Sequence, residues 1–568
     1  MSRDSHLFDI LRSKSLDGVL SKYVNVDDEG EVKKFLRSLS MINLDNVILL
    51  RHLLRSEMKS IDLSNLKAVP FSRSCPYDEC KQFQLIGAEA IKNSKIAFLV
   101  FSGGAATRLK EQYPELRELY IKKFGMDIGN DSSIPKGILP ISPLGYYTFI
   151  RLFAEQVLRL QYEYNSIVNL IIMVSSLTEN YVRKYFEENN YFGLMRRAVF
   201  FLLQQENPRL DPDGDMIFDG EKIVTTGDGH GGVYRALIES HLRDELIIRG
   251  VEAIAMFNVD NPLARFFDPC RIGYHFSKGS DFTISVVEKT EPDEKIGVVV
   301  EDVSTYRVIE YNMLDSKMRN VRNEEGELLF SCGHINNNIT NLAIIDKKFS
   351  PIVYKNKKIR IKDREIYTSS LEWLNQDIVT VINKSRVSLI GLKREEFFLP
   401  TKNVTGVDSI ETTVRGLNHY YKSIVDNSCK FYNGSILDVS PSFILDRRDD
   451  YRLRNLIMEE DSRLFIGACV DINDNLLVIN KGLILERGAS LRINSEKPFG
   501  DFEYDYVTNT ARPNLRFASK LNIKKPLRIK AGSNISIFIK GGGVLMINSG
   551  ELSGNISLIV EKEQKVEL

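Results

Sequence analysis

Cysteine, tryptophan and surplus charge are all scarce in this sequence. The 568 residues include 6 cysteines and 1 tryptophan, and 76 basic residues are matched by 76 acidic ones. The one close pair of cysteines, CPYDEC, lacks the CxxC spacing of a structural zinc site, so we expect ordinary reduced thiols. Balanced charge disfavours a general nucleic-acid or membrane-surface binder, although it permits a local basic pocket for a small anion.

Long hydrophobic runs are also absent. No uninterrupted apolar run approaches the ~18 residues of a membrane span, and the N-terminal MSRDSHLFDILRSKSLDGVL lacks the continuous apolar core of a signal peptide. We therefore expect a soluble, cytoplasmic protein that binds neither a membrane nor nucleic acid. A small anion is the better expectation for its ligand.

A chain of this length is too long for one hydrophobic core, and its texture divides it into three parts. Residues 1–94 repeat apolar residues at helical spacing, as in VKKFLRSL and VILLRHLL, with one short strand expected near residues 68–71. This pattern predicts a helical N-terminal region.

Residues 95–427 alternate short β-type runs with amphipathic stretches. Examples in chain order are IAFLVF, YTFIRLFAEQVLRLQ, LIIMVSS, ENYVRKYFEE and AIAMFNVD. Such alternation predicts βαβ crossovers and an α/β fold with a doubly wound sheet, mixed but mostly parallel. Ligands of such sheets bind outside the carboxyl ends of the strands.

Residues 428–568 have a third texture. Short β-rich runs, such as LLVINKG and ISIFIKGGG, are separated by Gly, Asn, Asp and Lys turns. We expect a small all-β domain, for which a coiled β-helix is one candidate although the repeat is irregular. Residues 495–520 interrupt this pattern and are expected to form an excursion from the domain.

The segment LVFSGGAATRLK ends a predicted strand on two glycines and an arginine. Gly103 and Gly104 let backbone N–H groups approach a ligand closely, and Arg108 can hold a phosphate bidentately. The segment has neither the GxxxxGK[ST] of a P-loop nor a clean GxGxxG, and a structural turn explains it equally well. Taken alone, it is a weak indication of a phosphate site.

Three later segments strengthen this indication because they follow it in order along the alternating elements. Lys136 lies in SIPKGILP just before a predicted helix, where its ammonium suits phosphate, and TTGDGHGG offers a second glycine-lined approach. Asp260 ends a strand in FNVDNPLAR, at the sheet edge where an oxygen ligand can hold Mg²⁺. Each is equally explained as a surface lysine, loop glycines or a capping aspartate, so only their joint order favours a phosphate-binding site.

These segments occur together with several longer motifs. In chain order the sequence has SGGAATRL, PKG, NNYFGL, QQENPRL, DGHGGVYRAL, VDNPLAR, VVEKT, IGVV, VIEY, LLFSCGH and LPTKN. Over roughly residues 45–425 this order resembles the eukaryotic-type UDP-sugar pyrophosphorylase family, most closely its UDP-N-acetylglucosamine pyrophosphorylase branch. The resemblance implies a Rossmann-like nucleotidyltransferase fold.

The resemblance also implies roles for individual residues. The family's phosphate-handling cations match Arg108, Lys136 and Lys402. Its ribose and metal aspartate matches Asp260, which implies Mg²⁺ as the cofactor. Its nucleotide-binding positions match Phe101, Ser102, Gly103, Gly104, Gln205, Gly229 and His230. Among these, Gln205 matches the glutamine that reads the uracil edge, and Gly229 the glycine that faces the base from the other side. Its sugar-binding positions match Gly297, Glu310, Tyr311 and His334.

The implied reaction needs no covalent nucleophile. An oxygen of a sugar 1-phosphate attacks the α-phosphorus of UTP in line and pyrophosphate leaves, so catalysis consists of positioning and charge neutralisation. This agrees with the lack of a recognisable Ser/His/Asp or Cys/His set in the sequence. UTP and a sugar 1-phosphate, here N-acetylglucosamine 1-phosphate, are the implied substrates, and we expect a monomer or a weak homo-oligomer.

Four positions depart from the family pattern. Ala106 and Lys110 occupy the last two glycine positions of its GGxGTRLG loop, and an alanine disfavours positive φ. His334 replaces an asparagine that contacts the sugar, and His230 gives GHG, the form of the UDP-glucose and broad-specificity branches. Two alternatives therefore stay open: UDP-glucose or mixed UDP-sugar specificity, and a non-catalytic nucleotide-sugar binder. The retained cations and Asp260 disfavour the binder.

Overall fold

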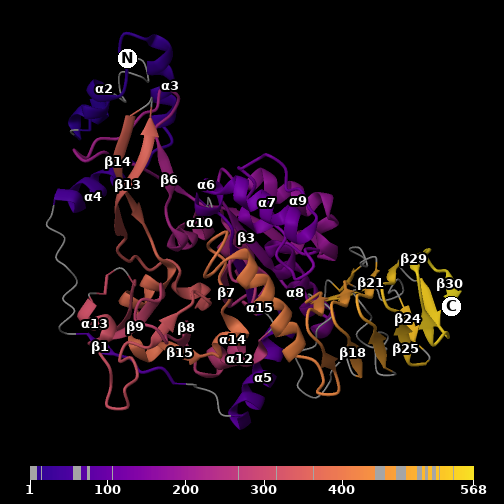
Figure 1. Ribbon diagram of the computed structural model, residues 1–568. Helices are drawn as coiled ribbons and strands as arrows, with labels where there is room; N and C mark the ends of the chain where they lie inside the picture. Colours follow the sequence, from indigo (N-terminus) through magenta and orange to yellow (C-terminus); the bar gives the residue numbers. More distant parts are fainter. Residues whose placement is uncertain are drawn as a thin grey trace.

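The computed structural model describes residues 9–14, 16–55, 66–72, 77–104, 107–265, 268–311, 313–314, 316–361, 364–441, 455–467, 482–495, 502–505, 510–513, 520–523, 525–540 and 543–568. Its central feature is a sheet of eleven strands (Figure 1). The strand order is β1 (Lys67–Ala68), β9 (Gly297–Asp302), β11 (Cys332–His334), β8 (Phe282–Glu288), β12 (Asn338–Asn341), β7 (Ala253–Asn258), β2 (Ile96–Phe101), β3 (Leu170–Val174) and β4 (Val199–Leu203). Beside this path, β10 (Thr305–Ile309) pairs with β9, and β15 (Val387–Gly391) pairs with β8.

The directions of these strands confirm a mixed, mostly parallel sheet. β2, β3, β4 and β7 are mutually parallel, and β8, β9 and β15 run the same way. β1, β10, β11 and β12 run in the opposite direction. The parallel half carries the carboxyl ends at which the sequence predicted a ligand.

Helices cover both faces of the parallel half, as a doubly wound fold requires. Along β2, Phe98 and Val100 pack in one core with α7 (Tyr113–Phe124) and α8 (Phe149–Tyr164). Ala97 and Leu99 pack in a second core with α10 (Val233–Glu239) and α11 (Leu242–Ile248). Because neighbouring side chains of a strand point to opposite faces, a strand that is apolar throughout must be covered on both sides.

The helices expected in residues 1–94 are present, but they pack in two separate places. α2 (Gly18–Lys22), α3 (Glu29–Leu39) and α4 (Leu44–Arg55) share a core with the long hairpin of β13 (Ile352–Ile361) and β14 (Arg364–Glu372). α5 (Tyr77–Lys92) packs instead on α12 (Pro269–Ser277), where Gly87 and Gly273 allow the two backbones to touch. The strand expected near residues 68–71 is β1, at the edge of the central sheet.

The N-terminal helices are also fixed by charge. The ammonium of Lys22 lies 3.2 Å from Asp211, 2.8 Å from Asp213 and 2.6 Å from Asp215. These hydrogen bonds raise the pKa of Lys22, although partial burial opposes the shift. The ammonium therefore holds α2 against the acidic DPDGD turn.

Most strands described between residues 428 and 568 form parallel ladders, as a coiled β-helix requires. One consists of β17 (Ile436–Val439), β19 (Arg463–Ile466), β21 (Ser490–Ser495), β26 (Asn534–Ile539) and β29 (Asn555–Val560). A second consists of β16 (Lys430–Phe431), β18 (Leu456–Met458), β20 (Leu483–Leu485), β25 (Leu527–Ile529) and β28 (Glu551–Leu552), and a third of β24 (Lys520–Ile523), β27 (Val544–Ile547) and β30 (Lys565–Glu567). Leu437, Leu464, Leu491 and Ile535 stack in register inside this β-helix.

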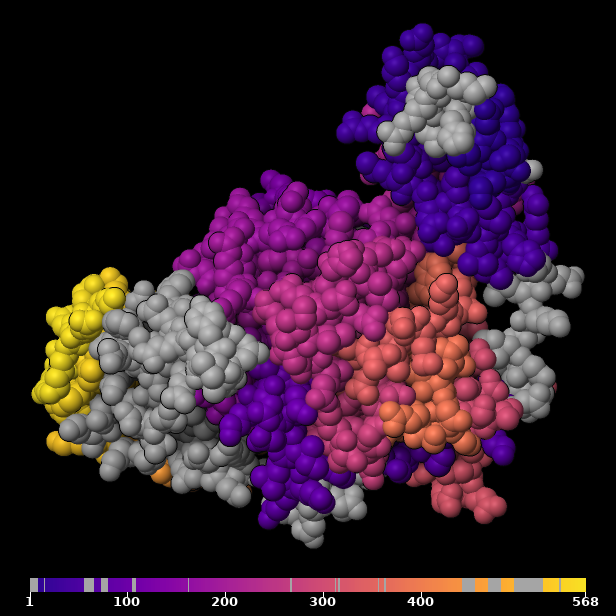
Figure 2. All heavy atoms as spheres, turned by 180° about the vertical axis from the view of Figure 1, so that it is seen from behind, coloured from indigo at the N-terminus to yellow at the C-terminus, as the bar shows by residue number. Residues whose placement is uncertain are grey.

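The expected excursion contains an antiparallel hairpin, β22 (Phe502–Asp505) with β23 (Thr510–Pro513). The β-helix and helices α2, α3 and α4 lie at opposite ends of the molecule (Figure 2). The exact domain boundaries at residues 94 and 427 stay predictions.

Four of the six cysteines lie within the described residues. Cys80, Cys270, Cys332 and Cys429 form no disulfide within the described part of the chain, and the thiol of Cys80 donates to the sulfur of Cys270 at 2.6 Å. Cys75 and Cys469 lie outside the described residues. Within the described part of the chain, no helix is long and apolar enough to cross a membrane.

Candidate active site

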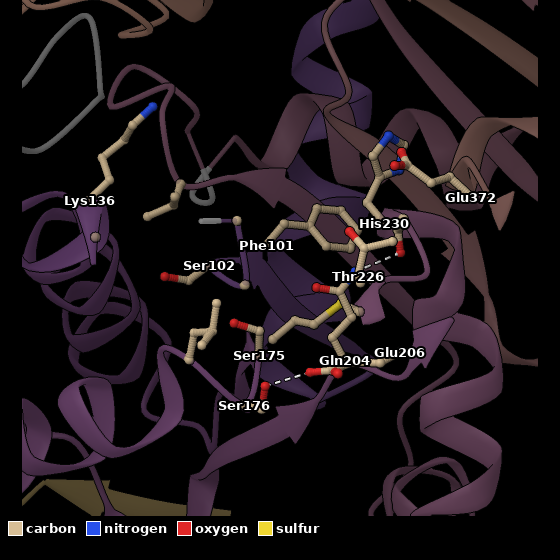
Figure 3. Close-up of a pocket in the computed structure, with 18 of the residues that line it drawn as sticks. Phe101, Ser102, Lys136, Ser175, Ser176, Gln204, Glu206, Thr226, His230 and Glu372 are labelled. Atoms are coloured by element: carbon tan, nitrogen blue, oxygen red, sulfur yellow. Dashed lines mark hydrogen bonds between the residues drawn. The ribbon is translucent and has the colours of Figure 1, made fainter. Parts of the chain in front are cut away.

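A cavity of about 610 Å³ opens at the carboxyl ends of the parallel strands (Figure 3). Its lining residues follow the strands directly: residues 101–104 at the end of β2, 175–177 after β3, 204 after β4 and 258–260 at the end of β7. The sequence predicted a ligand at this edge of the sheet, and the cavity is the place that can hold one.

The opposite wall comes from segments that are distant in sequence. It includes β6 (Thr225–Gly227), which pairs with β5 (Glu206–Pro208), together with Lys357 of β13 and Glu372 of β14. Glu206 accepts hydrogen bonds from the hydroxyls of Ser176 and Thr225. The long hairpin that carries the N-terminal helices therefore also closes one side of the cavity.

Eight of the predicted site residues line this cavity: Phe101, Ser102, Gly103, Gly104, Lys136, Gly229, His230 and Asp260. Figure 3 shows Lys136 apart from the group formed by Phe101, His230 and Gln204. Ala106 and the side chain of Arg108 lie outside the described residues, although α6 (Thr107–Glu111) begins directly after this loop. Lys110 lies in α6 and is half-buried.

Glycine is required at Gly229, whereas a side chain on Gly103 would displace the amide of Gln204. A Cβ on Gly103 would lie 2.6 Å from the Oε1 atom of Gln204, and a Cβ on Gly229 would lie 2.4 Å from the carbonyl oxygen of Trp373. Gly229 also has a φ of +83°, which disfavours any side chain. Among the described residues, apart from its chain neighbours, Gly104 has no atom within 4 Å of an added Cβ. Gly229 is thus needed for packing and Gly103 leaves room for the side chain of Gln204, whereas Gly104 leaves open space beside the cavity.

Gln204 lies on the cavity wall, whereas the family resemblance implies that its neighbour Gln205 reads the uracil edge. The Nε2 atom of Gln204 donates to the carbonyl oxygen of Gly229 at 3.1 Å, and its backbone N–H donates to Val174 at 2.7 Å. Gln205 is absent from the lining, and its carbonyl accepts from the backbone N–H of Asp228 at 3.0 Å. Neighbouring residues of an extended chain point to opposite sides, so a shift of one residue changes which side chain meets the ligand.

Lys136 and Asp260 meet at the other end of the cavity. The Nζ atom of Lys136 donates to the carbonyl oxygen of Thr401 at 2.7 Å and lies 3.9 Å from the Oδ2 atom of Asp260. The backbone N–H of Thr401 donates to the carbonyl oxygen of Asp260 at 2.8 Å. The segments of Lys136, Asp260 and Thr401 therefore hold one another, and they fix one ammonium beside one carboxylate.

This end of the cavity suits Mg²⁺ bound together with a substrate. Asp260 is a single, partly exposed carboxylate, and the described residues contain no group of three or more His, Cys, Asp or Glu side chains that could hold a metal. Mg²⁺ sites of enzymes that act on phosphates often use one or two carboxylates, with water and phosphate oxygens as the remaining ligands. The donor set here fits that arrangement and excludes an all-protein cage within the described residues.

Three predicted sugar-binding residues lie close together, namely Gly297, Glu310 and His334. His334 of β11 pairs in register with Gly297 of β9, and a Cβ on Gly297 would lie 3.6 Å from the Oε1 atom of Glu310. The same Oε1 atom accepts from the Nε2 atom of Gln376 at 3.2 Å. Tyr311 follows Glu310 and is half-buried. Lys402 does not line the cavity, but its charge acts on Glu310.

We call His230, Glu310, His334, Asn338, Asn375 and Gln376 the polar cluster. Asn338 is hydrogen-bonded to His334 at 3.2 Å and donates to Asn375 at 3.1 Å. The backbone N–H of Asn375 donates to the Nδ1 atom of His230 at 3.1 Å. Asn338 also donates to Asn336, which in turn donates to Asn258 on the cavity wall. Hydrogen bonds thus join the polar cluster to the cavity at two points.

Burial determines the charges of this region. It lowers the pKa of His230 to about 3, with a contribution from His334, and lowers the pKa of His334 to about 4, so both rings are neutral near pH 7. It raises the pKa of Glu310, which the charge of Lys402 opposes. The pKa of Asp377 is raised to about 7 by burial and by Glu310. The polar cluster therefore holds two neutral histidine rings near the carboxyl groups of Glu310 and Asp377. His230 is its member on the cavity wall, whereas Glu310 and His334 are not among the lining residues.

Comparisons with known proteins agree with this geometry. A family model described as UTP-glucose-1-phosphate uridylyltransferase matches residues 124–440. A protein of Dictyostelium discoideum named a probable UDP-N-acetylglucosamine pyrophosphorylase is 27% identical over 487 residues, which cover 80% of this chain and 94% of that protein. UDP-N-acetylhexosamine pyrophosphorylase-like protein 1 of Xenopus tropicalis is 32% identical over 47% of this chain and 50% of its own length.

The fold has a solved counterpart as well. The UDP-N-acetylglucosamine pyrophosphorylase of Trypanosoma brucei, solved with an inhibitor, superposes with a TM-score of 0.61 and 23% identity over 78% of this chain and 93% of that chain. At this identity the likeness concerns the fold alone. Because the family model spans more than half of the chain, the chain belongs to the UTP-glucose-1-phosphate uridylyltransferase family, as its motifs predicted.

Proposed function

We propose that the protein is a uridylyltransferase that makes UDP-N-acetylglucosamine and pyrophosphate from UTP and N-acetylglucosamine 1-phosphate. The observation that carries this proposal is one cavity that joins a glycine-lined slot beside Gln204 to the Lys136 and Asp260 pair. The first feature suits a flat base and the second suits phosphates. The name of the Dictyostelium relative, which matches over most of both chains, supports the same activity.

We assign uracil to the part of the cavity that Gly103, Gln204 and Gly229 line. The side chain of Gln204 lies against both glycines, and its amide can pair with the N3–H and a carbonyl oxygen of uracil. A pyrimidine with the opposite donor and acceptor order would leave polar atoms of this site unpaired, which costs affinity. Uracil recognition is therefore assigned to Gln204.

Gln204→Ala is expected to raise the KM for UTP by about 10- to 100-fold, because it removes hydrogen bonds to the base that form equally in the ground and transition states. Gln205→Ala is expected to leave this KM close to the wild-type value. Steady-state kinetics of pyrophosphate release measures both. A larger effect at Gln205 than at Gln204 would contradict the assignment.

The phosphate end supplies charge for an in-line displacement. Lys136 would hold phosphate oxygens of UTP, with Arg108 and Lys402 as the further cations that the motifs indicate. Asp260 is the residue that would bind Mg²⁺, which supplies neutralisation of phosphate charge when bound. The attacking phosphate of the sugar is already anionic, so the chain need not provide a general base.

The sugar is placed at the polar cluster. Glu310, which directly follows β10, is half-buried, and His334, the last residue of β11, is buried. Both side chains can bond sugar hydroxyls or an acetamido group. The charge of Lys402 acts on Glu310, so Lys402 lies near the polar cluster. This supports the proposal that Lys402 lies beside the phosphate of the sugar. Specificity among sugars would then depend on the polar cluster and not on the glycine loop.

His334→Asn is expected to change the ratio of kcat/KM between N-acetylglucosamine 1-phosphate and glucose 1-phosphate by about fivefold or more, since hydrogen-bonding side chains discriminate strongly between sugars. The exposed His241 provides a matched His→Asn control that should leave the ratio unchanged. Kinetics with the two sugar phosphates in separate assays measures it. An unchanged ratio in His334→Asn would reduce His334 to a packing role.

A panel assay separates the proposed activity from the two alternatives. The protein is incubated with UTP, Mg²⁺ and one of several sugar 1-phosphates, and pyrophosphate release is measured. The highest kcat/KM should occur with N-acetylglucosamine 1-phosphate. A preference for glucose 1-phosphate would favour the UDP-glucose alternative. Tight binding of UDP-sugars without turnover of any substrate would leave a non-catalytic binder.

A further inference from the structure

The first coil of the β-helix is joined to the catalytic region by buried hydrogen bonds. The Oδ2 atom of Asp438, in β17, accepts from the Oγ atom of Ser142 at 2.7 Å and from the backbone N–H of Leu144 at 2.8 Å. Two residues further on, the Oγ atom of Ser440 donates to Glu155 of α8 at 3.0 Å. All four side chains in these bonds have an exposed fraction of 0%. The contact is therefore internal and not a surface contact between separate domains.

The bonds of Asp438 fix a turn next to a proposed catalytic residue. Residues 142–147 lie between the short helix η2 (Lys136–Ile138), which carries Lys136, and α8. Within the turn, the Oγ atom of Ser142 also accepts from the backbone N–H of Tyr147 at 3.0 Å. The backbone N–H of Phe149 donates back to Leu139 at 3.3 Å. Asp438 thus holds a turn that is tied to the segment of Lys136.

Further coils of the β-helix touch the same turn. The ring of Tyr146 lies 4.3 Å from the ring of Phe465 in β19. The guanidinium of Arg492 in β21 lies 4.3 Å from the centre of the Tyr146 ring. Three successive strands of one ladder therefore contact residues 142–147, with Asp438 at the buried end.

A second route reaches the same end of the cavity through α15 (Ile410–Ser423). At one end of α15, Lys422 donates to the carbonyl oxygen of Ser435 at 2.6 Å, and Asn418 accepts from the backbone N–H of Leu437 at 2.9 Å. Near the other end, the hydroxyl of Thr413 is hydrogen-bonded to that of Thr401 at 2.6 Å, and both threonines are fully buried. Thr401 in turn bonds Lys136 and Asp260 through its backbone.

We propose that Asp438 is a positioning residue, through which the first β-helix coil holds the turn at residues 142–147 and thereby the ammonium of Lys136 at the phosphate end of the cavity. The inference rests on the proposed function. Burial raises the pKa of the Asp438 carboxyl to about 7, and the bonds from Ser142 and Leu144 oppose this shift. A buried carboxyl group is costly unless its partners are fixed, so these bonds select one position of the turn. A displacement of about 1 Å at a catalytic group can cost a factor of 100 in rate.

Three variants test this role by kinetics in the full chain. Asp438→Ala leaves Ser142 and Leu144 without their acceptor and is expected to lower kcat about 10- to 100-fold, with a smaller change in the KM for UTP. Asp438→Asn keeps an oxygen that can accept from both donors and is expected to recover most of kcat. Ile537→Ala, in the buried core of β26, should lower the melting temperature while leaving kcat within about twofold of wild type. Should Asp438→Ala fail to fold, Ser142→Ala removes one donor and tests the same bond.

A kcat for Asp438→Ala within about twofold of wild type would overturn the proposal, as would an equal loss of kcat in Asp438→Ala and Ile537→Ala. Hydrogen exchange over residues 136–148, read by mass spectrometry, tests the proposal without any activity. Faster exchange in Asp438→Ala, but not in Asp438→Asn, is the expected result, and unchanged exchange would contradict it. If wild-type protein turned over no sugar phosphate, the proposed function would fail, whereas the exchange result would still decide whether Asp438 holds the turn.

Discussion

Asp260→Asn is expected to lower kcat for UDP-sugar formation by about 100- to 1000-fold. The carboxylate of Asp260 is on the cavity wall, and its Oδ2 atom lies 3.9 Å from the ammonium of Lys136. An asparagine of the same shape keeps the backbone bond to Thr401 but removes the negative charge that would hold Mg²⁺. Phosphoryl transfer relies on such charge and positioning more than on covalent chemistry, so its removal should affect the rate more than the fold.

The measurement is pyrophosphate release at several Mg²⁺ concentrations, with the melting temperature as a check of folding. Asp260→Asn should need more Mg²⁺ to reach half of its residual rate. Asp244→Asn makes the same chemical change at an exposed position of α11 and should behave like wild type. A wild-type rate and an unaltered Mg²⁺ requirement in Asp260→Asn would remove this carboxylate from the mechanism.

Lys136→Met is expected to lower kcat/KM for UTP by a similar factor of about 100- to 1000-fold. Methionine retains most of the length of the side chain but loses the ammonium that donates to Thr401 and faces Asp260. The side chain of Lys136 is mostly buried, with an exposed fraction of 13%, so water screens its charge less than at the surface. Loss of the charge should weaken both UTP binding and stabilisation of the leaving pyrophosphate.

Lys184→Met, on the exposed surface of α9 (Glu179–Glu188), is the matched control and should keep the wild-type kcat/KM. Lys136→Arg restores a cation of different shape and is expected to recover only part of the loss. Kinetics in both reaction directions reports on UTP and pyrophosphate separately. A drop in melting temperature with an unchanged kcat/KM would show that Lys136 serves the loop and not the reaction.

Much of the cavity could be predicted because its residues sit at the ends of strong strand patterns. IAFLVF is apolar throughout, so β2 is buried on both faces and its carboxyl end, with Gly103 and Gly104, falls at the ligand edge. AIAMFNVD is likewise apolar over most of β7, so the end of this strand, with Asp260, also falls at the ligand edge. Such features depend on local periodicity and on the fixed polarity of parallel strands, and the sequence records both.

Other parts of the site depend on contacts that no local pattern records. Gln204 and Gln205 are neighbours after β4, and their side chains point to different sides of the chain. A shift of one residue in register therefore decides which of them meets the cavity. Lys357 and Glu372 line the cavity because the hairpin of β13 and β14, which follows β4 only much later in the sequence, folds back across it. Their sequence surroundings carry no motif, so only the tertiary structure assigns them to the wall.

The link between the β-helix and the catalytic region was likewise not predictable. The β-helix was expected from its turn-rich texture, but its role depends on Asp438, whose only local feature is a place in the strand ILDV. The partners of its carboxyl group, Ser142 and Leu144, lie 296 and 294 residues away in sequence. Pairings of this kind depend on how distant segments of the chain pack together and not on propensity or periodicity.

The proposed reaction is the attack of a sugar 1-phosphate on UTP in the cavity at the carboxyl edge of the sheet. Its most direct test is ³¹P nuclear magnetic resonance of the wild-type protein with UTP, Mg²⁺ and N-acetylglucosamine 1-phosphate, followed over time. UDP-N-acetylglucosamine and pyrophosphate should appear in equal amounts, and Asp260→Asn should form both far more slowly. Release of inorganic phosphate in place of pyrophosphate, or full conversion by Asp260→Asn, would contradict the proposed reaction.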